Sequence, residues 1–181
     1  MKSIKLLTLA FASFAFVSCN SDPSLQEYYV ENQQDNKFIA LDIPTSMFAN
    51  TEDLDENQKA TLESVKKINV LALPVKESIE AYEDEKAKLT QILRDEKYQL
   101  LMKYGSNDRR AEIYFTGDEE AIDEIIVYGY DDAKGVGVAR VLGENMNPQK
   151  LMEFIKSLDE GDLDINGLKE VAGIFKGELE Q

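Results

Sequence analysis

The stretch DLDING, residues 162–167, combines residue types and spacing that suit calcium binding. Asp162, Asp164, Asn166 and the glycine after them match the first, third, fifth and sixth positions of an EF-hand loop, whose ligands are oxygen atoms. The twelfth position needs a bidentate Glu and is Gly173 instead. We therefore favour Asn166 as the N-cap of a helix, and keep Asp162, Asp164 and Asn166 as the candidate metal ligands.

The residue types that the sequence lacks rule out much of the remaining chemistry. The chain has no His and no Trp, and Cys19 is its single cysteine. Serine and cysteine triads need a His base, and zinc and copper sites are built from His or Cys. An enzyme of this composition would depend on carboxylates, Lys or Tyr. We leave catalysis open, and expect a non-enzymatic protein with no small-molecule cofactor.

Three other patterns have a functional interpretation and a structural one, which we favour in each case. GVGVAR, residues 135–140, has Arg140 where a phosphate-binding loop needs its third glycine, so it is predicted to be a turn and strand. The acidic pairs at 119–120 and 123–124 fit solvated charges on a hairpin better than an acid–base pair. Three tyrosines could form an exposed binding face or pack half-buried on a sheet. These are Tyr114, Tyr128 and Tyr130.

Cys19 stands where an apolar run ends and a polar stretch begins. Lys2 and Lys5 precede the apolar residues 6–17, a length that fits a signal peptide and is too short to span a bilayer. The small residue Ser18 directly before Cys19 resembles the cleavage site of a bacterial lipoprotein. That resemblance implies a signal peptide at 1–18 and a diacylglycerol on the sulfur of Cys19. The alternative is an ordinary signal peptide that contains a cysteine.

The lipoprotein interpretation carries expectations about location. Phe16 departs from the Leu usual in such cleavage sites, while Asn20 replaces the Asp that favours inner-membrane retention in some bacteria. Residues 19–24 are then a lipidated tether, and two or more acyl chains give stable anchoring. We expect a cell-envelope protein anchored in the outer membrane, with its periplasmic or surface orientation open.

The charge of the chain limits its partners. The net charge is −15, and without Lys2 and Lys5 the remaining 18 basic and 35 acidic side chains give −17. Nucleic-acid binding depends on Lys and Arg that neutralise phosphates, and anionic lipid surfaces attract basic segments. We therefore expect no nucleic-acid partner, and contact with the membrane through the lipid alone. Solubility is the simplest role for the acidity.

Hydrophobic patterns predict the elements that would carry these residues. A short helix begins at Ser24, and buried strands are predicted at 37–44 and 69–75, joined by a helix from Asp53 to about Lys67. A charged helix follows at 78–96, with Ile79, Tyr82, Leu89 and Leu93 on its apolar face and a solvated face of Glu and Lys opposite. Strands are then predicted at 98–104, 109–117, 122–131 and 135–143, although 98–104 could instead extend the preceding helix. Asn147 and Pro148 begin a helix whose face holds Leu151, Met152, Ile155 and Leu158, and a last helix covers 168–175.

This order of elements predicts an α+β fold in a single domain, residues 25–181. A mixed or mostly antiparallel sheet of five to six strands is expected, with helices packed mainly on one face. A three-layer arrangement is the alternative.

The plan resembles a domain-of-unknown-function family of small Bacteroidota envelope lipoproteins. FIALDIPTSMF followed by a helix, then INVLALPV, YQLLMKYG and the AEIYF–IDEIIVYG hairpin carry the resemblance over nearly all of the mature chain. The family implies a fold and an envelope location but no catalytic residues. The expected function is thus a non-enzymatic binding or assembly role, with an envelope protein as the candidate partner. A calcium-dependent or carboxylate-based hydrolytic protein is the alternative.

Overall fold

In the computed structural model, residues 23–44 and 54–157 are described, and they form four helices and six strands. Their order is α1 (Leu25–Asn32), β1 (Ile39–Pro44), α2 (Glu56–Ser64), β2 (Val65–Pro74), α3 (Ile79–Ile92), β3 (Gln99–Gly105), β4 (Arg109–Asp118), β5 (Ala121–Asp131), β6 (Gly135–Met146) and α4 (Pro148–Ser157). The α+β class is confirmed. No helix in these two ranges is long and apolar enough to span a bilayer.

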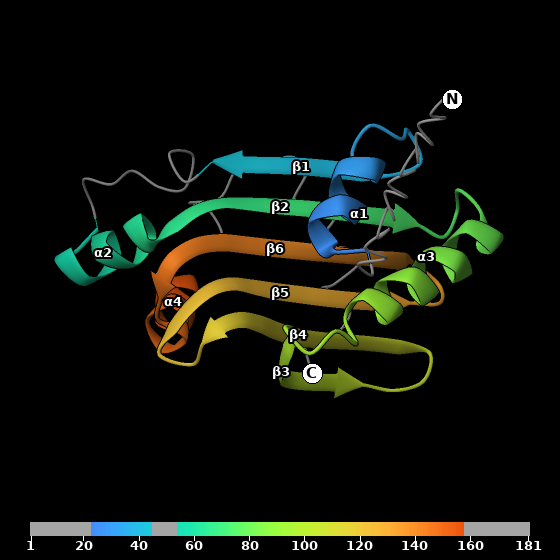
Figure 1. The fold of residues 1–181 in the computed structure, drawn as a ribbon. Coiled ribbons are helices and arrows are strands. Elements are labelled where there is room, and N and C mark those ends of the chain that lie inside the picture. Colours follow the sequence, from blue (N-terminus) through green and yellow to red (C-terminus); the bar gives the residue numbers. More distant parts are fainter. Residues whose placement is uncertain (1–22, 45–53, 158–181) are drawn as a thin grey trace, which may run out of the picture.

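All six strands join one open antiparallel sheet in the order β1-β2-β6-β5-β4-β3 (Figure 1). The strands β3 to β6 follow one another as hairpins, and β2 pairs with β6 from Val65 opposite Gly143 to Pro74 opposite Gly135. Because side chains alternate across a strand, each strand contributes to both faces. The mostly antiparallel sheet is confirmed, and it has six strands.

The helices α1 and α3 cover one face of the sheet (Figure 1). Their residues form the main apolar core together with alternate residues of β2, β5 and β6. On the opposite face, α2 and α4 meet at one end of the sheet, where Leu62 and Leu151 share a second cluster with Ile43, Phe115 and Met146. The face under α1 and α3 is the one that carries the candidate site.

Two predicted boundaries, those of the second helix and of the strand after it, are wrong. The helix expected to reach Lys67 ends at Ser64, because Val65 and Ile68 pair in β2 instead of completing a helical stripe. Its capping box uses Asp55 and Gln58, so the helix begins after the predicted Asp53. β2 therefore begins four residues before the predicted strand.

The charged helix α3 is shorter than predicted and differs in one residue of its apolar face. Ser78 caps it and Leu93 ends it. Tyr82, Leu89 and Leu93 are buried as expected, whereas Ile79 is 73% exposed because the first turn extends beyond the sheet. The segment after it forms strand β3 and does not continue the helix.

The later elements follow the prediction closely. β6 runs three residues further than expected, and α4 begins at Pro148 with Asn147 Oδ1 accepting a hydrogen bond from the Lys150 N–H at 3.0 Å. Leu151 is buried. Leu158 and the predicted helix at 168–175 lie outside the described residues.

Candidate functional site

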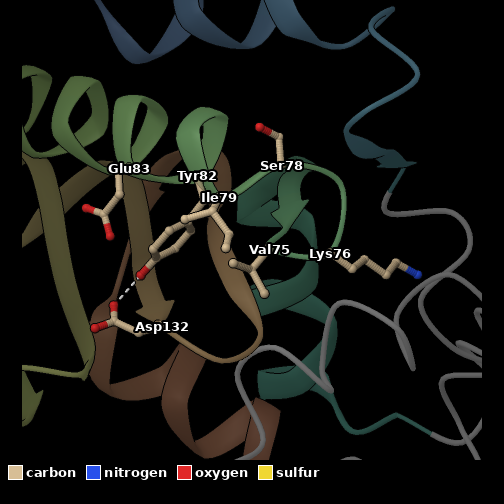
Figure 2. A pocket seen from close by; sticks show the side chains of 7 residues that line it. All are labelled: Val75, Lys76, Ser78, Ile79, Tyr82, Glu83 and Asp132. Carbon is tan, nitrogen blue, oxygen red and sulfur yellow. Dashed lines mark hydrogen bonds between the residues drawn. The ribbon is translucent and has the colours of Figure 1, made fainter.

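A groove lies where α3 begins, against the turn between β5 and β6 (Figure 2). Its volume is about 450 Å³, and its lining combines apolar, acidic and hydroxyl groups with one basic side chain, Lys76. The lining residues are Val75, Lys76, Ser78, Ile79, Tyr82, Glu83 and Asp132. This combination offers an apolar wall and an acidic rim to a binding partner.

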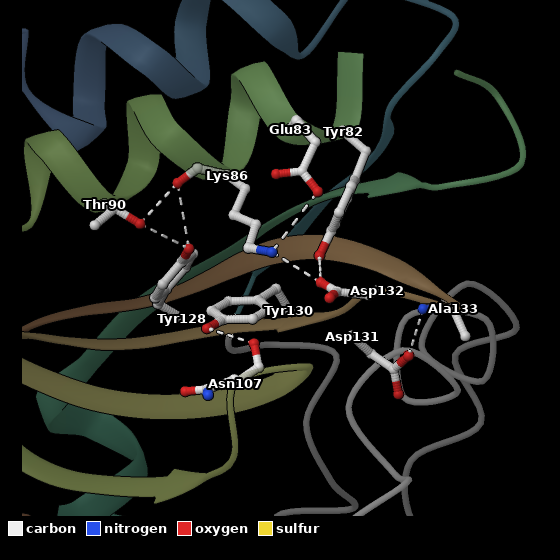
Figure 3. A network of polar contacts seen from close by, with 10 residues as sticks. All are labelled: Tyr82, Glu83, Lys86, Thr90, Asn107, Tyr128, Tyr130, Asp131, Asp132 and Ala133. Carbon is white, nitrogen blue, oxygen red and sulfur yellow. Dashed lines mark hydrogen bonds and ion pairs between the residues drawn. The ribbon is translucent and has the colours of Figure 1, made fainter. Parts of the chain in front are cut away.

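Backbone hydrogen bonds fix the two sides of the groove. The Val75 N–H donates to the carbonyl of Lys134 at 2.9 Å, which ties the end of β2 to the β5–β6 turn. Within that turn, Asp131 Oδ1 accepts a hydrogen bond from the Ala133 N–H at 2.8 Å (Figure 3). The Asp132 N–H donates to the Asp108 carbonyl at 2.9 Å. The turn is therefore held on both sides, and Asp132 keeps a fixed place beside α3.

Asp132 accepts two hydrogen bonds from α3 at the base of the groove. Tyr82 Oη donates to Asp132 Oδ1, and Lys86 Nζ donates to the same oxygen at 2.8 Å (Figure 3). The bond from Lys86, and then that from Tyr82, lowers the pKa of Asp132 below its ordinary value. Burial, followed by the hydrogen bond to Asp132, raises the pKa of Tyr82. At neutral pH the carboxylate is thus ionised and the phenol neutral.

Lys86 connects this carboxylate to the aromatic residues of the sheet. Its Nζ lies 4.3 Å from the ring centroid of Tyr130 and 5.0 Å from that of Tyr82, distances typical of cation–π contacts. It also lies 3.9 Å from Glu83. One turn further along α3, Thr90 Oγ1 and Tyr128 Oη are 3.1 Å apart. These contacts hold α3 against β5 and so fix the position of the groove.

A buried carboxylate lies further along the same helix. Glu85 is only 8% exposed, and its Oε1 accepts a hydrogen bond from Lys88 Nζ at 2.6 Å. That bond raises the pKa of Lys88. Burial raises the pKa of the neighbouring Tyr28, with the Glu85 carboxylate adding to the effect. The solvated Glu and Lys face predicted for α3 therefore does not include Glu85.

A second polar cluster crosses the sheet beneath α1. Arg140, 4% exposed, pairs through Nε with Glu124 and donates from Nη1 to Gln26 Oε1 at 2.8 Å. Arg140 lies opposite Asn69 in the register. Glu124 was expected to be a solvated turn charge, and this prediction is wrong because the sheet alternation turns it toward Arg140.

The same row continues to the outer strand β1. Asn69 lies opposite Asp42, and both its Nδ2 and the hydroxyl of Tyr29 donate to Asp42 Oδ1, the latter at 3.1 Å. Burial, with the Asp42 carboxylate, raises the pKa of Tyr29 to about 12. Asn69 Oδ1 is buried and has no hydrogen-bond partner in the described part of the chain. The row is a set of polar contacts between α1 and four strands, β1, β2, β5 and β6.

The other sequence-derived candidates have clear outcomes. Residues 135–140 form a turn and strand as predicted; Gly135 has φ 147°, and a Cβ there would lie 2.2 Å from the Leu73 carbonyl oxygen. Glu119 and Glu120 are exposed at the hairpin, as expected. The three tyrosines pack with the main core, which confirms the structural interpretation. They are Tyr114, Tyr128 and Tyr130.

Cys19 and the candidate calcium ligands Asp162, Asp164 and Asn166 lie outside the described residues. Within 23–44 and 54–157, no group of three or more carboxylate, His or Cys residues is placed to hold a metal ion. The sequence reasoning did not identify Lys86 or Asp132 as site residues. The only signal for them is the interruption of the apolar face of α3 between Tyr82 and Leu89.

A family model described as a domain of unknown function, DUF4252, matches residues 28–154. The chain belongs to this family. The DUF4252 match runs from α1 into α4, so it includes all six strands, the groove beside α3, the contacts of Asp132 and, apart from Gln26, the cluster around Arg140. It includes neither Cys19 nor residues 162–166. No curated protein matches the chain, and no solved structure does.

Proposed function

We propose that this DUF4252 chain is a lipid-anchored Bacteroidota envelope protein with a non-enzymatic binding role. The lipid on Cys19 holds it in the outer membrane. The groove beside α3 takes a segment of an envelope protein that carries Lys or Arg next to an aliphatic side chain.

One observation carries the binding role: the groove places an exposed apolar side chain beside carboxylates that are already fixed. Ile79 is 73% exposed at the rim, and binding sites are concave surfaces that combine apolar walls with a few fixed polar groups. Asp132 is held by Tyr82 and Lys86, which limits the ordering cost of binding. Because Tyr82 and Lys86 both donate hydrogen bonds to Asp132, the arrangement supports recognition of a partner better than proton transfer.

The chemistry of the partner follows from the lining. Glu83 and Asp132 are exposed acids, and the chain as a whole has a net charge of −15. Lys86 neutralises one carboxylate and leaves the other available for a second cation. Val75 and Ile79 supply an apolar surface. A basic and aliphatic segment satisfies both parts of the lining.

The binding role is tested by affinity purification of the full chain from detergent-solubilised cell membranes. An envelope protein recovered with the unchanged chain should be lost with Ile79→Glu. The matched control is Val30→Glu, which places the same charge at an exposed apolar residue of α1, 52% exposed. Equal recovery with both variants, or no envelope partner at any salt concentration, would rule out this groove as the binding site.

The anchoring is tested separately with Cys19→Ser. The variant should lose incorporation of a labelled fatty acid and move from the membrane fraction to the soluble fraction, while its far-UV circular dichroism stays unchanged. Label that persists in the variant would show that the lipid is attached elsewhere.

A further inference from the structure

The sheet face that carries α2 and α4 is apolar well beyond these two helices. Because side chains alternate across a strand, the strand pairing shows which residues share this face. Two neighbouring rows on it cross all six strands without a charged side chain. The first row consists of Leu41, Val70, Ala139, Val127, Ile113 and Met102. The second row runs from Ile39 in β1 to Tyr104 in β3 and is otherwise Ala and Gly.

The inner part of these two rows is buried without a described helix above it. Val70 and Ala72 are 2% and 1% exposed, whereas Met102 and Tyr104 at the β3 end are 54% and 56% exposed. Within the described part of the chain, the partly buried apolar residues packed against Val70 and Ala72 all come from strands. Neighbours in the same sheet flank a side chain without covering its outer end, and a sheet face is buried against another layer. A further layer is therefore expected over β2 and β6.

The helices α2 and α4 lie too far toward one end of the sheet to form this layer. Figure 1 shows both helices at the end where β2 begins. There Leu62 and Leu151 pack with the next row of the sheet, which includes Ile43 and Phe115. The cluster around Val70 contains no residue of either helix.

The size of the two rows fits a short segment better than a second copy of the chain. Six strands about 4.8 Å apart and two rows about 7 Å apart give a patch of about 300 Å². A stable protein–protein interface buries about 800 Å² on each partner. A helix of eight residues is about 12 Å long and about 10 Å wide, so it covers the part of the patch over β2, β6 and β5.

Residues 158–181 of the same chain provide such a segment. They lie outside the described residues and follow α4, which is on this face of the sheet. Residues 158–167 can extend over as much as about 33 Å, and the first row lies only about 7 Å along the strands from Phe115. The helix predicted at 168–175 has apolar residues at i, i+3, i+4 and i+7, which form one stripe. These are Leu168, Val171, Ala172 and Phe175.

Two other segments outside the described residues are less suitable. Residues 1–18 are the expected signal peptide, which is absent from a processed chain. Residues 45–53 connect the end of β1 to α2, so both of their ends are held at the end of the sheet that α2 and α4 already cover.

From these observations we propose that the chain covers this sheet face with its own C-terminal segment. The helix at 168–175 packs its apolar stripe on the two rows where they cross β2, β6 and β5. Glu170, on the opposite side of that helix, faces water. Met102 and Tyr104 stay exposed because the helix does not extend to β3.

Disulfide trapping in intact cells tests this contact with the full chain. Ala139→Cys, in the middle of the first row, should form a disulfide with Val171→Cys within one chain. The matched control pairs Ala139→Cys with Glu170→Cys. Trypsin releases the two sites within residues 135–140 and 170–176 in both double variants, so mass spectrometry compares the same pair of linked peptides. We expect about ten-fold more linked peptide with Val171→Cys than with Glu170→Cys. Val127→Cys replaces Ala139→Cys in a second pair of variants, which allows for a shift of the helix along the row.

Three results of the trapping would overturn the proposal. They are equal amounts of linked peptide with Val171→Cys and Glu170→Cys, no linked peptide at either sheet position, and a disulfide between two chains, which would assign the face to a second copy.

Thermal unfolding of the purified full chain supplies a second measurement. Phe175→Gln should lower Tm by about 4 °C or more, because it removes a buried aromatic ring, and Glu170→Gln should leave Tm unchanged. Equal Tm values for the two variants would refute the packing of this stripe on the sheet.

Discussion

Removing one member of the Arg140–Glu124 pair should destabilise the chain far more than removing both. The Arg140 side chain is 5% exposed and that of Glu124 is 13% exposed. Leaving one buried partner charged and unpaired typically costs about 3–5 kcal/mol. Since Glu124 keeps some contact with water, we expect about 3 kcal/mol for Arg140→Met. For a chain of this length that lowers Tm by about 6–12 °C.

The double variant Arg140→Met, Glu124→Met provides the decisive comparison. It removes both charges and keeps two unbranched apolar side chains of similar length, so it should be no less stable than either single variant. Urea unfolding followed by far-UV circular dichroism measures all four proteins. Gln26→Ala isolates the hydrogen bond that Arg140 also donates, and should cost about 1 kcal/mol. Strictly additive losses, about 6 kcal/mol in the double variant, would refute a direct interaction between the two charges.

Three further predictions test the packing of α3 and the β5–β6 turn. Leu89→Ala, at a fully buried position, should lower the free energy of unfolding in urea by about 2–5 kcal/mol. Asp84→Ala, at an exposed position of the same helix, should lower it by no more than about 0.5 kcal/mol. Similar losses in both variants would mean that the assignment of buried and exposed faces of α3 is wrong. Asp132→Asn should lower Tm at pH 7. Because the pKa of Asp132 is lowered in the folded chain, the difference in Tm between the unchanged chain and the variant should shrink as pH falls below about 3.9, and it should vanish below the lowered pKa. A difference in Tm that stays constant with pH would contradict this prediction. Gly135→Ala should lower the free energy of unfolding by about 1–3 kcal/mol through backbone strain. An unchanged urea midpoint would count against the close contact between residue 135 and the backbone of β2.

Much of the fold can be predicted because its strands alternate clearly and its turns are polar. The run from β3 to β6 is an example, since each strand is separated from the next by a short polar segment. The boundary between α2 and β2 is different. Val65 and Ile68 are three residues apart, which fits a helical stripe, and pairing with β1 and β6 decides for a strand. Such tertiary effects are not visible in a local window.

The candidate site is harder to predict because its partners are far apart in the sequence. Lys86 and Asp132 are separated by 46 residues, and Arg140 and Gln26 by 114. A local pattern indicates only that the apolar face of α3 is interrupted at Glu85 and Lys86. Glu85 meets Lys88 three residues further along the same helix. For Lys86 the pattern cannot show the partner, because the pairing of the sheet strands brings Asp132 into place.

The pairing of β2 with β6 has a consequence for how the chain folds. β3 to β6 can form from neighbouring hairpins, and β1 with β2 from residues on either side of α2, whereas β2 meets β6 across a long stretch of chain. Closing that long loop is entropically costly, so we expect the joining of these two parts of the sheet to be the slow step of folding. Pulse-labelled hydrogen exchange should show amides in β4 and β5 protected before those of β2. Until the halves join, the inner edges of β2 and β6 are open to other chains, so the time the chain spends in this state sets its exposure to aggregation.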